Sequence, residues 1–171
     1  MAMTLGEFTF APYGQPSSAW TAWAENIPTS RSMGLRCVSI TTGHAVVELT
    51  KCDWPLTPSG AVHGGMVLAW ADHCLGIVGS TAVSRGQAPA TATVSARFLR
   101  PAIPPLTFEA TVQRTGRTLQ FVQVEVRSSD GRVAALVEGT MVVDGTSRHV
   151  QPAESSPATV LPPRGVQDDA G

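Results

Sequence analysis

The residues most able to do chemistry lie in one apolar segment near the middle of the chain. This segment begins with the glycine-rich run Gly60-Ala-Val-His-Gly-Gly65 and continues through Met, Val, Leu, Ala and Trp residues to a single carboxylate, Asp72. No other acidic residue occurs between Asp53 and Glu109. Because carboxylates are rarely buried without a partner or a function, the pattern predicts a chemical role for Asp72 inside a buried helix.

Two kinds of group in this segment complement each other. The first N–H groups of a helix have no partner within the helix and lie at the positive end of its dipole. The N–H groups of Gly64 and Gly65 are expected there, where they can stabilise negative charge that develops on a carbonyl oxygen. Glycine also lets a ligand approach the backbone closely. Asp72 supplies a carboxylate that can attack a carbonyl or deprotonate water.

The elements that must position these groups follow from the apolar periodicity. The apolar segment predicts a helix over about 62–80, and from residue 90 onward the apolar period changes from about 3.6 to 2. Alternation with intervening prolines and tight turns predicts four strands, over 90–100, 106–113, 122–127 and 133–143. The last three form an antiparallel meander. Upstream, the sequence predicts a short helix from Ser17 to Ile27 that stops before Pro28 and a hairpin of residues 35–40 and 45–49.

An apolar helix of this kind must be covered on most of its sides. The predicted fold is therefore α+β: a hotdog fold, in which a curved antiparallel β-sheet wraps around one long central helix. We divide the 171 residues into an N-terminal extension (1–33) with a short helix, a hotdog domain (34–145) and a disordered tail (146–171) rich in Pro, Ser and Thr.

Composition excludes several classes of protein. The net charge of −1 leaves no basic excess for nucleic acid, and no run of 18 apolar residues predicts a membrane span. The three cysteines have no CxxC spacing, and the N-terminus lacks a secretory pattern, so we expect reduced thiols and a cytoplasmic location. The histidines lack the spacing of metal ligands, so no metal is predicted.

The motif Gly60-Ala-Val-His-Gly-Gly65, followed by Ala71-Asp72 and by the strand Val94-Ser-Ala-Arg-Phe-Leu-Arg-Pro101, resembles hotdog-fold acyl-CoA thioesterases of the phenylacetate-degradation type. The resemblance covers roughly residues 34–143. It implies hydrolysis of an acyl-CoA thioester to a free acid and a free thiol, without metal or other cofactor. It also implies that Asp72 acts as nucleophile or general base, that the Gly64 N–H polarises the thioester carbonyl, and that the protein is a homodimer or homotetramer.

Other site residues are assigned with this chemistry in view. His63 either donates to the carbonyl or shapes the turn, and Gly65 is placed in the substrate-binding set. Thr57 stands where many members of the family carry Asn or Gln. The phosphates of CoA need cations, for which Arg100 and Arg117 are the candidates we favour.

Helix geometry adds a demand of its own. Gly64 and Asp72 are eight residues apart, which corresponds to about 12 Å along one helix axis. One reacting carbonyl cannot touch both groups, since each contact should be near 3 Å. If both act, they come from different subunits, so we expect a two-fold dimer with two sites.

Two alternative functions stay open on the sequence alone. The first is a hotdog dehydratase or hydratase acting on 3-hydroxyacyl or enoyl thioesters, although the motif of histidine and carboxylate that such enzymes use is not found. The second is a non-catalytic acyl-CoA-binding protein. The acyl group, and the choice between CoA and a carrier protein as the thiol, depend on the shape of the pocket and are not predicted.

Overall fold

The computed structural model describes residues 11–52, 54 and 56–144. Within these residues the chain forms three helices and six strands. They are α1 (Ser17–Asn26), α2 (Pro28–Ser32), β1 (Arg36–Thr41), β2 (His44–Leu49), α3 (Gly64–Thr81), β3 (Ala88–Phe98), β4 (Leu106–Thr115), β5 (Leu119–Arg127) and β6 (Val133–Asp144). The tail predicted over 146–171 lies outside the described residues.

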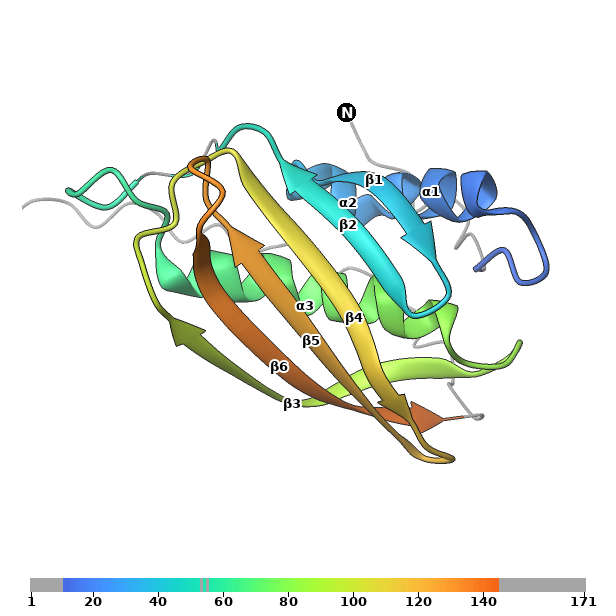
Figure 1. The fold of residues 1–171 in the computed structure, drawn as a ribbon. Helices are drawn as coiled ribbons and strands as arrows, with labels where there is room; N and C mark the ends of the chain where they lie inside the picture. The colour runs from blue at the N-terminus through green and yellow to red at the C-terminus, as the bar shows by residue number, and fades with distance from the viewer. Residues whose placement is uncertain (1–10, 53, 55, 145–171) are drawn as a thin grey trace, which may run out of the picture.

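The strands form one antiparallel sheet in the order β1-β2-β4-β5-β6-β3. The predicted meander is confirmed, because β4, β5 and β6 are consecutive neighbours, and the predicted hairpin is confirmed as β1 and β2. Strand β3 follows α3 and returns to pair with β6 at the far edge. Figure 1 shows the curved sheet in front of α3, so the predicted hotdog fold is confirmed.

Helix α3 lies close against the inner face of the sheet because two glycines permit it. A methyl group added at Gly139 in β6 would overlap the Leu75 Cδ1 atom of the helix. On the helix side, a methyl group at Gly79 would lie 2.6 Å from the Gln120 Oε1 atom and 3.1 Å from the Met141 sulfur. The backbone of the helix therefore sits where larger residues would hold it off the sheet.

The N-terminal extension differs from the prediction at the end of α1. Helix α1 ends at Asn26, one residue before the predicted end at Ile27, and the chain does not leave the helical region at Pro28. Instead, Pro28 begins the short helix α2. Proline is tolerated in the first turn of a helix because its missing N–H would have no helical partner there. Figure 1 shows α1 and α2 beside β1, at the end of the sheet opposite β3.

Strand β3 lies at one edge of the sheet, and no other described strand pairs with its outer side. Its side chains are almost all exposed, on both faces of the strand. Val94 is 37% exposed and Phe98 is 53% exposed, although Phe98 pairs with the buried Ala135 of β6 and Val94 pairs with Gly139. An open edge strand with apolar side chains is a surface on which another strand can pair.

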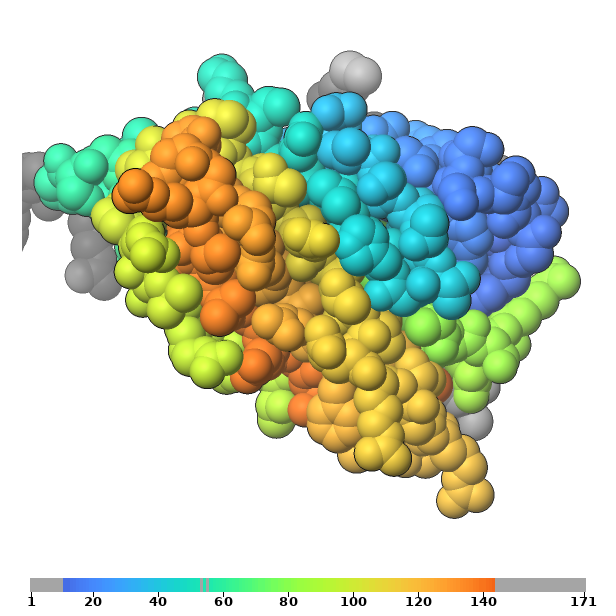
Figure 2. Space-filling view, viewed as in Figure 1, coloured from blue at the N-terminus to red at the C-terminus, as the bar shows by residue number. Residues whose placement is uncertain are grey.

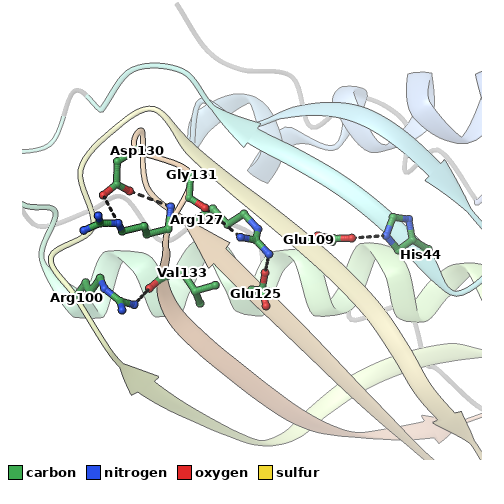
Figure 3. A network of polar contacts seen from close by, with 9 residues as sticks. His44, Arg100, Glu109, Glu125, Arg127, Asp130, Gly131 and Val133 are labelled. Carbon is green, nitrogen blue, oxygen red and sulfur yellow. Dashed lines mark hydrogen bonds and ion pairs between the residues drawn. The ribbon is translucent and has the colours of Figure 1, made fainter.

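The outer face of the sheet is turned toward the viewer in Figure 2. On this face β2, β4 and β5 carry polar side chains, among them His44, Glu109 and Glu125. Glu109 and Glu125 stand directly opposite each other across β4 and β5. Each carboxylate has a nitrogen-bearing side chain beside it (Figure 3). His44 Nε2 lies 3.2 Å from the Glu109 carboxylate, and Arg127 forms an ion pair with Glu125.

No helix among the described residues is long and apolar enough to cross a membrane.

Candidate functional site

The site begins where α3 starts. The helix begins at Gly64, two residues later than predicted, because the Val62 N–H donates to the Ala102 carbonyl and keeps the chain extended. His63 is the N-cap, with φ −61° and ψ 134°, and its Nδ1 atom accepts a hydrogen bond from the Gly65 N–H at 3.1 Å. Of the two roles predicted for His63, the structure shows the shaping of the turn.

The His63 cap gives the N–H groups of Gly64 and Gly65 different roles, although the sequence alone does not distinguish them. The Gly65 N–H is taken by His63 Nδ1, and the N–H groups of Met66 and Val67 both donate to the His63 carbonyl, at 2.9 and 3.2 Å. The Gly64 N–H is thus the donor of the first helical turn that makes no hydrogen bond within the described part of the chain. The first turn presents one free donor, and it is the one predicted to polarise a carbonyl.

An aromatic ring that the sequence analysis did not select lies beside this donor. A methyl group added at Gly64 would stand 3.1, 3.3 and 3.5 Å from three atoms of the Phe98 ring. Phe98 is the last residue of β3, 34 positions away in sequence by subtraction of the two residue numbers. Only the packing of the edge strand beside the start of α3 brings the ring to this place.

Asp72 lies in the middle of α3, on a helix whose sheet-facing side chains are buried. Its Oδ1 atom is shielded from solvent and has no hydrogen-bond partner among the residues that the structure describes. A shielded carboxylate oxygen without a donor is costly, so a group outside this arrangement is needed to satisfy it. Gly64 of the same helix cannot bring a shared ligand to it, because eight helical residues separate them by about 12 Å.

The residue after Asp72 is held by the N-terminal extension. His73 Nε2 lies 2.8 Å from the Ser30 hydroxyl, and Ser30 is 2% exposed. Burial lowers the pKa of His73, and the nearby Asp72 carboxylate opposes this change only in part. A neutral imidazole is therefore favoured beside Asp72. The His73 ring thus contacts α2 of its own chain.

Thr57 lies in the turn that leads to α3. Its hydroxyl donates to the Ala61 carbonyl at 3.0 Å, accepts from the Ala61 N–H at 3.2 Å, and lies 3.0 Å from the Ser59 hydroxyl. These bonds fix the turn over residues 57–61. The hydroxyl at this position therefore has partners in the polypeptide already, unlike the Gly64 N–H and the Asp72 Oδ1 atom.

The two arginines predicted to bind CoA lie far apart. Arg100 follows β3, near Phe98, and its Nη1 atom donates to the Val133 carbonyl at 3.0 Å (Figure 3). Arg117 lies in the turn between β4 and β5, at the opposite end of the sheet. Within one chain, only Arg100 is close to the start of α3.

A cysteine nucleophile and a metal centre find no support in the described residues. Cys74 is fully buried, and desolvation raises the pKa of its thiol, with the neighbouring Cys37 thiol adding to the increase. A thiol in this setting is held in its unreactive neutral form. No group of three or more His, Cys, Asp or Glu side chains in the described ranges is arranged to hold a metal ion.

The hotdog fold and the free Gly64 N–H at the start of α3 are what is expected of a thioesterase, and comparison with known proteins agrees. Residues 59–135 match the family described as the thioesterase superfamily, and this match contains both Gly64 and Asp72. The acyl-coenzyme A thioesterase PaaI of Escherichia coli is 27% identical over 120 residues, which cover 69% of this chain and 84% of the relative. Residues 59–135 thus form a thioesterase superfamily domain with the hotdog fold, and the chain is a thioester hydrolase.

Two solved structures extend the comparison. The structure of E. coli PaaI superposes with a TM-score of 0.63 at 25% identity, covering 71% of this chain and 87% of that chain. A Streptococcus mutans protein, solved with bound acetyl-CoA, superposes with a TM-score of 0.58 at 28% identity, covering 65% of this chain and 89% of that one.

Proposed function

We propose that this protein hydrolyses acyl-CoA thioesters at a site formed by two copies of the chain. In this proposal the Gly64 N–H of one copy polarises the thioester carbonyl. Asp72 of the other copy acts on the opposite side as nucleophile or general base. The products are a free carboxylic acid and CoA thiol, and the water that enters supplies the oxygen of the acid and the proton of the thiol.

The observation that carries the proposal is a pair of unsatisfied groups on one rigid helix. The Gly64 N–H and the Asp72 Oδ1 atom both lack a partner in the described part of the chain. Their separation of about 12 Å prevents one carbonyl carbon from reaching both within a single chain. A two-fold arrangement that brings α3 of a second copy alongside supplies the missing group to each.

Strand β3 supports the same arrangement. Its free edge and its exposed apolar side chains give a second copy a surface on which to pair. The pairing of two β3 strands would continue the sheet across the two copies. A dimer is the smallest assembly that completes the site, and a tetramer would contain two such dimers.

The choice of CoA as the thiol half rests on the relatives. One relative is named an acyl-coenzyme A thioesterase, and a similar structure was solved with acetyl-CoA. We propose that Arg100 binds a phosphate of CoA near the start of α3, and that Arg117, at the other end of the sheet, contributes only if a second copy brings it there. The three free cysteines, Cys37, Cys52 and Cys74, agree with a cytoplasmic location.

The test is thiol release across a panel of acyl-CoA substrates, measured for the wild type, Asp72→Asn and a matched control. Asp130→Asn is the control, because Asp130 is an exposed carboxylate in the turn between β5 and β6. We expect Asp72→Asn to lower kcat by about a hundredfold or more, since it keeps the size of the side chain and removes the base. We expect Asp130→Asn to change it little.

The same assay separates the alternatives. A dehydratase or hydratase would change the absorbance of a C=C bond without releasing thiol, and an acyl-CoA-binding protein would bind without turnover. Full activity of Asp72→Asn, or full activity of a species shown to be monomeric by sedimentation, would contradict the proposal.

A further inference from the structure

Phe98 occupies a position that the packing of the core does not explain. It is the last residue of β3 and pairs with Ala135 of β6, so both side chains lie on the inner face of the sheet. Ala135 is fully buried, whereas Phe98 is 53% exposed. A large aromatic side chain left half in water gains little from burial in this chain.

The Phe98 ring is nevertheless in a defined place. Three of its atoms lie 3.1–3.5 Å from the point where a Cβ atom of residue 64 would stand. The ring therefore lies directly beside the Gly64 backbone, where a Cβ atom at residue 64 would displace it by a few tenths of an ångström. Because Gly64 also carries the free N–H donor of the first turn of α3, the ring and the donor border the same space.

We propose that Phe98 is a specificity-determining residue that contacts the acyl group next to the reacting carbonyl and selects against branching there. This inference rests on the proposed hydrolysis of acyl-CoA at Gly64. A carbonyl oxygen that accepts from the Gly64 N–H lies about 3 Å from that nitrogen. The substituents of the carbonyl carbon then lie one or two bonds further out, within contact distance of a ring that packs on Gly64.

The chemistry of the ring assigns it to the acyl half of the substrate. The arm of CoA that carries the sulfur contains amide groups, which need hydrogen-bond partners when they are shielded from water. A phenyl ring offers none, but it is a good contact for hydrocarbon. Leu99, 50% exposed, follows Phe98 directly and extends the apolar surface. Acyl groups with an unbranched carbon beside the carbonyl fit next to the ring, whereas a branch at that carbon collides with it.

The experiment compares kcat/KM for butanoyl-CoA and for 2-methylpropanoyl-CoA, which have the same number of carbons and differ in branching beside the carbonyl. The variants are Phe98→Ala, Phe98→Leu and Phe98→Trp. Phe121→Ala is the matched control, because Phe121 is also a half-exposed aromatic residue (43%) but lies on the outer face of β5. Circular dichroism and thermal melts of each variant establish that it is folded.

We expect Phe98→Ala to raise the ratio of branched to straight-chain kcat/KM about tenfold, which is the size of effect that one methylene group has in an apolar pocket. Phe98→Leu should raise the ratio less, Phe98→Trp should lower it, and Phe121→Ala should leave it unchanged. If Phe98→Ala does not fold, the opposite shifts of the Leu and Trp variants carry the test.

Three results would overturn the inference: a ratio that none of the Phe98 variants changes, an equal change in Phe121→Ala, or a change in KM of the same size for both substrates. The last would place the ring against the thiol half of the substrate. Failure of the proposed function looks different, because the wild type itself would then release no thiol from either substrate.

Discussion

Replacement of Gly64 by proline removes the proposed carbonyl donor while the helix is expected to remain. Proline has no N–H, and it is tolerated at the first position of a helix, which Gly64 occupies. The residue before a proline is restricted to extended conformations, and His63 already has φ −61° and ψ 134°. The hydrogen bond from the Gly65 N–H to His63 does not involve the lost group.

The matched control is Gly64→Ala, which keeps the N–H. Both alanine and proline place a Cβ atom 3.1–3.5 Å from the Phe98 ring, so both displace that exposed ring by a few tenths of an ångström. The two variants share this Cβ contact and differ in the N–H, which proline lacks, and in the Cγ and Cδ atoms of the proline ring. Loss of one donor to a developing oxyanion lowers kcat by about 10²–10³. We expect Gly64→Pro to be slower than Gly64→Ala by at least about a hundredfold in kcat.

Mixing two inactive variants tests whether the site is split between copies. Dimers are formed from equal amounts of Gly64→Pro and Asp72→Asn chains, refolded or expressed together. Random pairing makes half of the dimers mixed, and each mixed dimer holds one site with both groups intact, so about a quarter of the wild-type activity should return. Thiol release is measured on the mixture and on each parent, with the two chains carrying different tags for isolation of mixed dimers.

Two results would refute this reasoning. If Gly64→Pro and Gly64→Ala have equal kcat while both are folded, the Gly64 N–H does not act on the carbonyl. If the mixed dimer stays as inactive as its parents, the two groups do not meet across copies, whatever each does alone.

The remaining predictions concern how α3 is held in place. Gly139→Ala should destabilise the fold by about 1–3 kcal/mol because its methyl group overlaps Leu75, and Leu75→Val should suppress part of this loss in a double-mutant cycle measured by urea unfolding; additive costs would contradict the contact. Burial lowers the pKa of His73, so the unfolded chain takes up this proton first. The free energy of unfolding should therefore fall as the pH decreases from about 6.5, the pKa in the unfolded chain, toward the lower pKa in the folded chain. The decrease is at most about 1.4 kcal/mol per pH unit, and this group has no effect on stability above about pH 6.5. Thermal melts of the wild type and His73→Gln from pH 8 to 5 check this, and equal pH dependence of the two would refute it.

Most of the fold follows from periodicity, since a change from a period of 3.6 to a period of 2 marks the passage from α3 to the meander. The helix boundary that was predicted wrongly is set by a tertiary contact. The helix starts at Gly64 instead of Val62 because Val62 is drawn into a hydrogen bond with Ala102, forty residues later by the residue numbers. The sequence around Val62 contains no pattern that indicates a hydrogen bond to so distant a carbonyl.

The site is predictable only in part for the same reason. A lone Asp72 and a pair of glycines can be read from the sequence, but the choice between Gly64 and Gly65 depends on which N–H the His63 ring accepts. Phe98 has the alternation of a strand residue and nothing that marks it as a neighbour of α3. Its position follows from the crossover that returns β3 to the edge beside β6.

Strand β3 also shows why the alternation of apolar residues must be interpreted with care. Val94 and Phe98 follow the pattern of a half-buried strand, and the structure places them on the inner face of the sheet, yet both stay exposed. Among the residues that the structure describes, β3 has an uncovered apolar face, the Gly64 N–H has no acceptor and the Asp72 Oδ1 atom has no donor. Each of these features is unfavourable when nothing else covers or satisfies it. One second copy of the chain, paired along β3, would cover the first and bring the other two to a common substrate. We therefore propose the dimer as the smallest assembly in which all three features are satisfied.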